Sequence, residues 1–366
     1  MHRALRQSIL SILVLVSIAS VAALGSREAA PLPAGPDQSQ TVPSGAPPAG
    51  LPAAGVIQSS PVARAPEASL KIRIGALKGP TGIGMIYLFE TPSEPTSGYE
   101  LKVEAIASAD AMAARIMSGE LDAAVLPVNM AAKLYNAGLP YRLLAVTGNG
   151  MVKVVTTEPT IGSLEDLRGR RVYVAGQGAT PEFLMRTVLT HAGIDPDRDV
   201  ALVYNMPYPE MAAGVVSGKI PVAVLPEPFA TMALRGNPGA RVPFQLDAAW
   251  NVATGRSTYP MSVFVARSSI IDGNGQVIET ILQAYEASIA SVKSSPAAAG
   301  ELVHKHDMGL TAAIAEAAIP RSAYTFVRAP DARTDVEALL TVFLKAAPAS
   351  IGGKLPDAAF YATPGR

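Results

Sequence analysis

The chain has 366 residues, of which 49% are hydrophobic and 16% are charged, so it is long enough for two domains with sizeable cores. It contains no cysteine, which excludes a disulfide scaffold, a cysteine-ligated metal site, a thiol nucleophile and a cysteine-anchored lipoprotein. Thirty basic residues balance thirty acidic ones without a basic run, so nothing indicates nucleic-acid binding, and four histidines argue against an all-histidine metal site.

The first 25 residues have the layout of an export signal. Arg3 and Arg6 precede an apolar run over residues 9–24, and small residues then offer a cleavage site. The alternative is an uncleaved membrane anchor, but this run is shorter than the ~20 residues that a spanning helix prefers. We therefore expect residues 1–25 to be a signal peptide and the protein to be periplasmic or otherwise extracytoplasmic.

A proline-rich segment follows the export signal. Residues 29–66 contain nine prolines and four glycines but only two charged residues, Asp37 and Arg64. Such a composition cannot bury enough apolar surface to offset the entropy lost on ordering. We expect residues 26–68 to be a disordered linker, either a tether or a simple spacer, that is dispensable for binding.

An internal repeat organises the rest of the chain. Residues 112–127 read MAARIMSGELDAAVLP and residues 211–226 read MAAGVVSGKIPVAVLP, with nine of sixteen positions identical. Each copy predicts a helix that ends at Ser-Gly, with Gly119 or Gly218 as its C-cap, and then a short buried strand. Two copies of one such unit indicate two similar α/β lobes.

The remaining segments alternate between strand and helix patterns, which is typical of parallel sheets. A capped helical turn is expected at Ser163, and a helix over residues 181–192. We expect the chain after Ile270 to be mainly helical. The further predicted strands cover residues 70–77, 103–107, 142–146, 152–156, 171–175, 200–204 and 261–266.

The strand pattern restarts near residue 164, before the C-terminal helices, which suggests that one lobe is inserted into the other. We expect an α/β fold of two doubly wound lobes with a central cleft and hinge, plus C-terminal helices. Lobe 1 would comprise residues 69–157 and 257–366, and lobe 2 residues 158–256.

Ligands of doubly wound sheets bind beyond the carboxyl ends of the strands, and four loops meet this condition. Two lead into helices, where free N–H groups favour negative charge or carbonyl oxygens. In these two loops, Thr81 and Thr180 are also expected to cap the following helices. The candidate ligand contacts in them are Thr81, Gly82, Gly84, Gln177, Gly178, Ala179 and Thr180.

The other two loops follow the repeated strands. They contribute Asn129, which can donate and accept hydrogen bonds, and Glu227, which could bind a ligand cation or N–H group or could brace an arginine. We further expect that a valine at Gly82 or Gly178 would block the ligand and leave the fold intact. Tyr208, Met206 and Trp250 are candidates for an apolar wall, with core packing as the alternative.

Motifs of catalysis are absent from the sequence, because it has no GxSxG, HExxH or Walker A pattern. His304, His306 and Asp307 lie close together in sequence, but they fall in the C-terminal helical region, away from the predicted cleft. We therefore expect no catalytic residue, no metal and no cofactor.

Several stretches together carry a family resemblance. They are SGELDAA from residue 118, LEDLRGRRV from 164, GATPE from 178, LTHAGIDPDRDV from 189 and EPF from 227. In order and spacing, they resemble the solute-binding components of ABC importers for alkanesulfonates, taurine, nitrate or the pyrimidine precursor of thiamine. The resemblance covers roughly residues 70–345, although the loop KGPTGIG at residue 78 departs from the usual opening of sulfonate binders.

This resemblance implies a type II periplasmic-binding fold and a monomer that captures a small organic molecule or anion between two lobes. The captured ligand would pass to an ABC permease in the membrane. One alternative is a periplasmic sensory subunit. Another is an enzyme similar to thiamine-pyrimidine synthases, but the positions of the histidines argue against its active site.

Overall fold

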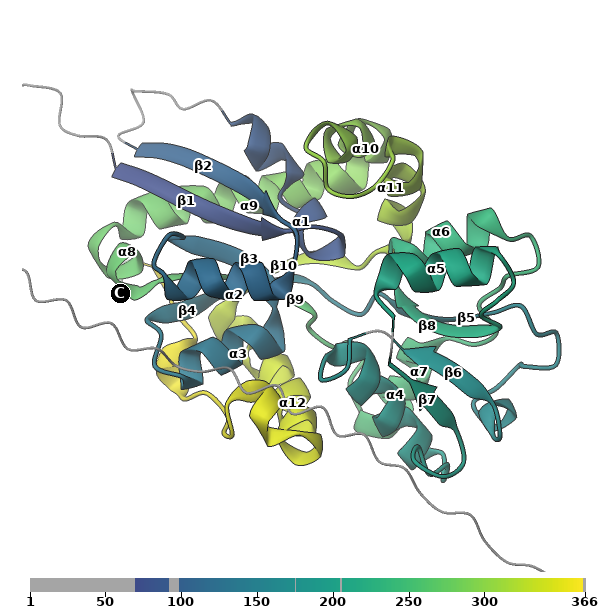
Figure 1. Ribbon diagram of the computed structural model, residues 1–366. Coiled ribbons are helices and arrows are strands. Elements are labelled where there is room, and N and C mark those ends of the chain that lie inside the picture. Colours follow the sequence, from purple (N-terminus) through teal and green to yellow (C-terminus); the bar gives the residue numbers. More distant parts are fainter. Residues whose placement is uncertain (1–69, 92–98, 175, 205, 365–366) are drawn as a thin grey trace, which may run out of the picture. The chain divides into compact units, whose positions relative to one another are not determined.

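The computed structural model describes residues 70–91, 99–174, 176–204 and 206–364 (Figure 1). The predicted signal peptide and linker lie outside the described residues. The described chain is α/β, with one six-stranded and one four-stranded sheet, as the sequence predicts. No helix within these ranges is long and apolar enough to cross a membrane.

The six-stranded sheet has the strand order β10-β4-β9-β3-β1-β2. Alternation of apolar residues makes β1 a strand, and Ile72 and Ile74 point into the core with 0% exposure. Strand β1 pairs in parallel with both β2 and β3. The strands are β1 (Leu70–Leu77), β2 (Tyr99–Ile106), β3 (Ala123–Pro127), β4 (Tyr141–Gly148), β9 (Ser262–Arg267) and β10 (Tyr324–Arg328).

The four-stranded sheet has the order β5-β8-β6-β7, and β6 pairs in parallel with β7 and β8. Its central strand β8 is a continuous apolar run that is buried along its whole length, as expected for a strand covered on both faces. The strands are β5 (Val152–Thr156), β6 (Arg171–Val174), β7 (Ala201–Val203) and β8 (Val222–Pro226).

The expectation of parallel sheets is wrong for three strands. Strand β5 runs antiparallel to β8, β9 runs antiparallel to β3 and β4, and β10 runs antiparallel to β4. The chain passes from the end of β4 to the start of β5 within a few residues, and it enters the second sheet beside the carboxyl end of β8. Because β5 starts at that edge, it must run in the direction opposite to β8.

The helices follow the predicted pattern, and the repeat is confirmed (Figure 1). Each copy is a helix, a Ser-Gly end in which the glycine has a φ of +74°, and a buried strand. The C-caps are Ser118 and Ser217, so the expected caps Gly119 and Gly218 are wrong by one position. The helices are α1 (Pro80–Ile83), α2 (Ala109–Met117), α3 (Val128–Asn136), α4 (Thr180–His191), α5 (Tyr208–Val216), α6 (Phe229–Gly236), α7 (Leu246–Thr254), α8 (Ser268–Gly273), α9 (Gly275–Ser294), α10 (Pro296–Lys305), α11 (Ala312–Ala318) and α12 (Ala329–Ala346).

One strand was not predicted, and one local expectation is wrong. The region after Ile270 is mainly helical, as expected, but it also contributes β10, an edge strand in which Tyr324 is buried and the other residues are partly buried. Ser163 does not cap the following turn with its side chain. The Asp166 carboxylate instead reaches back and accepts hydrogen bonds from the backbone N–H groups of Gly162 and Ser163, both at 2.9 Å. The side chain of Asp166 therefore caps this turn in place of Ser163.

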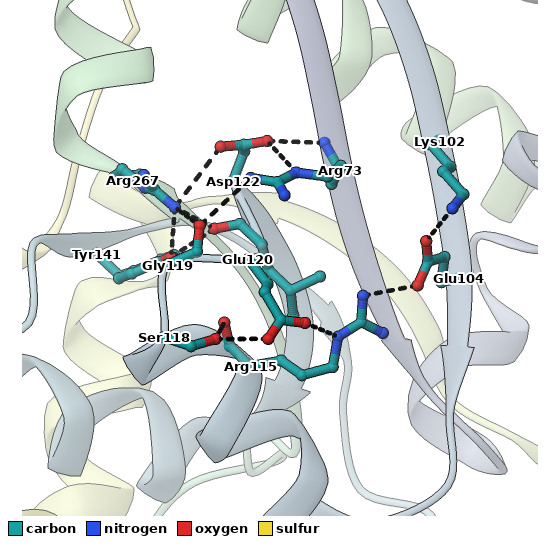
Figure 2. A network of polar contacts seen from close by, with 11 residues as sticks. Arg73, Lys102, Glu104, Arg115, Ser118, Gly119, Glu120, Asp122, Tyr141 and Arg267 are labelled. Atoms are coloured by element: carbon teal, nitrogen blue, oxygen red, sulfur yellow. Dashed lines mark hydrogen bonds and ion pairs between the residues drawn. The ribbon is translucent and has the colours of Figure 1, made fainter.

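A polar network holds the strands together at the amino end of β3 (Figure 2). Asp122 accepts hydrogen bonds from the backbone and the side chain of Arg73 in β1, at 2.9 and 3.4 Å. Arg267, at the end of β9, lies 3.6 Å from the same carboxylate and donates to the carbonyls of Gly119 and Leu121. This buried carboxylate thus joins three strands at the edge opposite the predicted ligand loops.

Candidate functional site

The loop after β1 brings a glycine close to an aromatic side chain of the helix that follows β8. Gly79 has a φ of +89°, and a Cβ built on it would lie 3.9 Å from Cε2 of Phe229 in α6. Gly79, and not Thr81, is the N-cap of α1, so the expected capping role of Thr81 is wrong. Thr81 lies inside the short helix and is 9% exposed.

Gly82 and Gly84 are packed against the core. A Cβ at Gly82 would lie 2.5 Å from both the carbonyl oxygen of Leu77 and Cε of Met308. The expectation that a valine there leaves the fold intact is therefore wrong. The carbonyl oxygen of Gly84 accepts a hydrogen bond from the hydroxyl of Ser288 in α9 at 2.9 Å. A Cβ built on Gly84 would contact side chains of the same helix. Close packing explains the glycine at position 82, whereas a Cβ at Gly84 would make only ordinary contacts, the nearest at 3.4 Å. The contact of either residue with a ligand stays a prediction.

The loop between β6 and α4 is organised by a buried carboxylate. Glu182, 8% exposed, accepts a hydrogen bond from the backbone N–H of Gly178 at 2.7 Å and another from Arg186 at 3.0 Å. Ala179 is the N-cap of α4, so the expected cap Thr180 is wrong by one position, and Thr180 is buried as the first helical residue. Gln177 is exposed at the tip of the loop.

Asn129 connects the two predicted groups of loops. Its side-chain Nδ2 donates a hydrogen bond to the carbonyl oxygen of Gly178 at 3.3 Å. Its Oδ1 is buried and accepts no hydrogen bond from the described residues. The second residue of α3, which follows β3, therefore contacts the loop that follows β6. Two predicted ligand contacts from different lobes thus lie side by side.

An aromatic pair lies beside these loops. The rings of Tyr208, which begins α5, and Phe229, which begins α6, stack with centroids 5.4 Å apart. A Cβ built on Gly176 would lie 3.2 Å from the Tyr208 hydroxyl oxygen. Burial raises the pKa of Tyr208 to about 12, so this phenol stays protonated at neutral pH. Trp250, the other proposed wall residue, is a core residue with 1% exposure.

Glu227 follows β8 and is 0% exposed. Its Oε2 accepts hydrogen bonds from the backbone N–H and the hydroxyl of Thr231, at 3.0 and 2.6 Å. Its Oε1 accepts a hydrogen bond from Nε of Arg321 at 2.9 Å. Of the two roles considered from the sequence, bracing an arginine is therefore the one that the structure contains.

Arg321 was not identified from the sequence. It lies just before β10, a strand that was also missed, and 94 residues separate it from its partner. Its side chain is 44% exposed. The only signal in the sequence was Glu227 itself, because a buried carboxylate needs a cationic or hydrogen-bonding partner.

The histidines near the C-terminal region make other contacts. His306 contacts the carboxylate of Glu90, which also pairs with Lys305, and Asp307 pairs with Lys78 at 2.6 Å. Within the described ranges, no group of three or more histidine, cysteine, aspartate or glutamate side chains is placed to hold a metal ion.

Comparisons with solved structures show the fold. An ABC transporter protein from Parabacteroides distasonis is 25% identical, with a TM-score of 0.67 over 81% of this chain and 99% of that one. The periplasmic aliphatic sulphonate binding protein SsuA from Escherichia coli is 18% identical, with a TM-score of 0.62 over 79% and 93%. The desulfurization enzyme DszB is 15% identical, with a TM-score of 0.55 over 81% and 97%.

A search of curated proteins finds no match. The sequence model of the NMT1-like family, in contrast, matches residues 86–305, which is more than half of the chain and includes both repeat copies. The chain therefore belongs to the NMT1-like family.

Proposed function

We propose that the protein captures a small organic molecule or anion between the loops of its two sheets and delivers it to the permease of an ABC importer. One observation carries the proposal: the loops at the carboxyl edges of both sheets meet in pairs. The pairs are Asn129 with Gly178, Arg321 with Glu227, and Gly79 with Phe229. Ligands of open α/β sheets bind at such edges.

The comparisons support this role. The protein from P. distasonis, named as an ABC transporter, matches this chain over nearly all of its own length at 25% identity. The E. coli neighbour is named as a periplasmic sulphonate binding protein. A solute-binding role outside the cytoplasm agrees with the export signal predicted over residues 1–25 and with the linker predicted over residues 26–68.

The lobe boundaries belong to the same proposal. All strands of the four-stranded sheet fall within residues 152–226, and the six-stranded sheet is built from strands before and after that range. This distribution supports a lobe 2 inserted between two parts of lobe 1. The expected bounds, residues 158–256 for lobe 2 and residues 69–157 and 257–366 for lobe 1, need one change, because β5 belongs to the four-stranded sheet and lobe 2 therefore begins no later than residue 152. Two chain crossings between the lobes would form the hinge.

We also propose that the protein binds its solute without converting it. The fold does not decide this point, because DszB is an enzyme with a similar fold. The buried carboxylates of the loops do bear on it. Glu227 is engaged by Thr231 and Arg321, and Glu182 by Gly178 and Arg186, so neither is a free general base.

A thermal-shift screen of sulfonates, carboxylates, pyrimidines, flavins and nitrate tests the proposal, together with mass spectrometry of small molecules released from the purified protein. A ligand at one hundred times its dissociation constant stabilises the fold by about 2.7 kcal/mol, which gives a clear upward shift. Release of one compound that also shifts the unfolding temperature is the expected result. Conversion of that compound by the purified protein would contradict the proposal.

A further inference from the structure

The ion pair of Glu227 and Arg321 differs from the other described ion pairs in how much of each partner's side chain is exposed. Among the ion pairs in the described ranges, only this one joins a carboxylate of 0% exposure to a cation of 44% exposure. Among the described residues, Thr231 and Arg321 donate three hydrogen bonds to the carboxylate. A buried carboxylate with this many partners has a fixed position, so it fixes the arginine that it holds.

The guanidinium is held by one edge only. Nε donates to Glu227, whereas Nη1 and Nη2 make no hydrogen bond or ion pair with any residue in the described ranges. Nη1 and Nη2 form a planar fork whose two parallel N–H groups match the two oxygens of a carboxylate or sulfonate. Binding by Nε therefore orients the group and leaves the fork free to contact a solute.

Arg321 lies at the edge where the predicted ligand loops gather. The carbonyl of Ala323, two residues on, accepts a hydrogen bond from the backbone N–H of Asn149, which follows β4. The ring of Tyr324 lies 3.5 Å from a Cβ built on Gly84. The Arg321 side chain then reaches Glu227 at the end of β8. It thus crosses from the carboxyl edge of one sheet to that of the other.

The ion pairs of these loops leave no excess positive charge. Glu227 neutralises Arg321, Asp307 pairs with Lys78, and Arg186 pairs with both Glu182 and Asp197. A site with an oriented fork but no excess positive charge suits a single negative charge better than two.

From these observations we infer that Arg321 binds the oxyanion group of a singly charged solute, a carboxylate or a sulfonate, and that Glu227 positions it. This inference rests on the proposed solute-binding function. It assigns Glu227 a positioning role through the arginine and no contact with the solute.

The probes are matched pairs of an anion and its neutral amide: benzenesulfonate with benzenesulfonamide, benzoate with benzamide, and hexanoate with hexanamide. Phenyl phosphate is added as a doubly charged compound. Calorimetry on the wild-type protein should show that the preferred anion binds at least about tenfold more tightly than its amide, because hydrogen bonds between charged groups are the stronger ones. It should also bind more tightly than phenyl phosphate.

Two variants separate recognition from charge compensation. Arg321→Lys keeps a positive charge for the buried carboxylate but loses the fork. The double variant Glu227→Gln/Arg321→Gln removes both charges, so no buried charge is left unpaired. Both should fold, as circular dichroism would check, and both should bind the preferred anion at least about tenfold more weakly.

Arg333→Gln is the matched control. Arg333 in α12 is 45% exposed and also donates through Nε to one carboxylate, that of Glu337, at 2.7 Å. Its loss should leave the affinity unchanged. Wild-type affinity in both folded Arg321 variants, or preference for an amide or for phenyl phosphate, would overturn the inference and leave the solute-binding function intact. A wild-type protein that binds no probe and releases no small molecule would overturn both.

Discussion

Gly82 is packed too closely for any side chain. A Cβ there would meet the Leu77 carbonyl oxygen and the Met308 methyl group at 2.5 Å, and the carbonyl belongs to the backbone and cannot move away cheaply. We expect Gly82→Ala to lower the free energy of unfolding by about 1–3 kcal/mol, as overpacked core substitutions do.

Denaturant unfolding of Gly82→Ala beside Gly273→Ala checks this expectation. Gly273 ends α8, has open space around its Cα and does not have a left-handed φ, so alanine there should be neutral or slightly stabilising. Equal stability of the two variants would show that the loop after β1 is not packed as described.

Gly178 offers a cleaner probe of the ligand loops. Its φ is +75°, and a Cβ there would meet no atom of the described residues within 4 Å; the same holds for Gly138, at a φ of +85°. Alanine at either position should cost about 1–2 kcal/mol of stability, because a left-handed backbone brings Cβ close to the following carbonyl. The expected valine test at Gly178 would have mixed this strain with any effect on binding.

The two alanine variants are therefore compared for binding. Gly178→Ala should lower the affinity for the solute found by screening by about tenfold, because one added methyl group has this effect in a closely fitting site. Gly138→Ala should bind as the wild-type protein does, since Gly138 follows α3 at the helix end away from Asn129. Calorimetry measures both affinities, and equal affinities would remove Gly178 from the site.

At the scale of elements, the Asp122 network anchors the start of β3 (Figure 2). Asp122→Asn keeps the shape of the side chain but removes the charge that faces Arg73 and Arg267. We expect a loss of about 1–3 kcal/mol in the free energy of unfolding. Glu100→Gln, which breaks the exposed pair with Lys71, should cost less than about 1 kcal/mol. Similar losses in both variants would contradict a special role for Asp122.

A second ion pair joins α9 to β10. Arg328 donates to both carboxylate oxygens of Glu279, at 2.8 and 2.7 Å, and these hydrogen bonds lower the pKa of Glu279. A carboxyl group whose pKa is lower in the folded state stabilises the fold above its unfolded pKa. That stability is lost as the pH falls through the folded pKa.

The pH dependence of Glu279→Gln tests this pair. The difference in unfolding free energy between wild-type protein and variant should be constant near pH 7 and shrink toward pH 3. Protonation removes the charge of Glu279 in the wild-type protein, whereas glutamine does not titrate. Urea unfolding at several pH values measures it. A difference that is as large at pH 3 as at pH 7 would show that the pair contributes nothing through its charge.

Elements with a strong local pattern could be predicted from the sequence. The strands Leu70–Leu77 and Val152–Thr156 have the predicted bounds, and the two Ser-Gly helix ends lie where the repeat places them. Strand β10 could not be predicted, because it is a half-buried edge strand in an otherwise helical region. Strand direction is a property of how the chain crosses between sheets, and the local sequence does not contain it.

At the scale of the whole molecule, the site is only partly predictable. The rule that ligands bind beyond the carboxyl ends of strands predicts Asn129 and Gly178, which lie in contact, and Glu227, which follows β8. The partner Arg321 could not be found, because no local pattern connects residues 94 positions apart. Caps were misplaced by one or two residues, since several backbone conformations satisfy the first turn of a helix.

Hydrogen–deuterium exchange, with and without the compound that stabilises the protein most in the screen, tests the central claim that one solute contacts the loops of both sheets. We predict slower exchange in residues 79–83 and 128–132 of one sheet's loops and in residues 176–182 and 227–232 of the other's, with α12 unchanged. Each range contains backbone N–H groups at the start of a helix. Protection confined to the loops of one sheet, or found only in α12, would contradict the account.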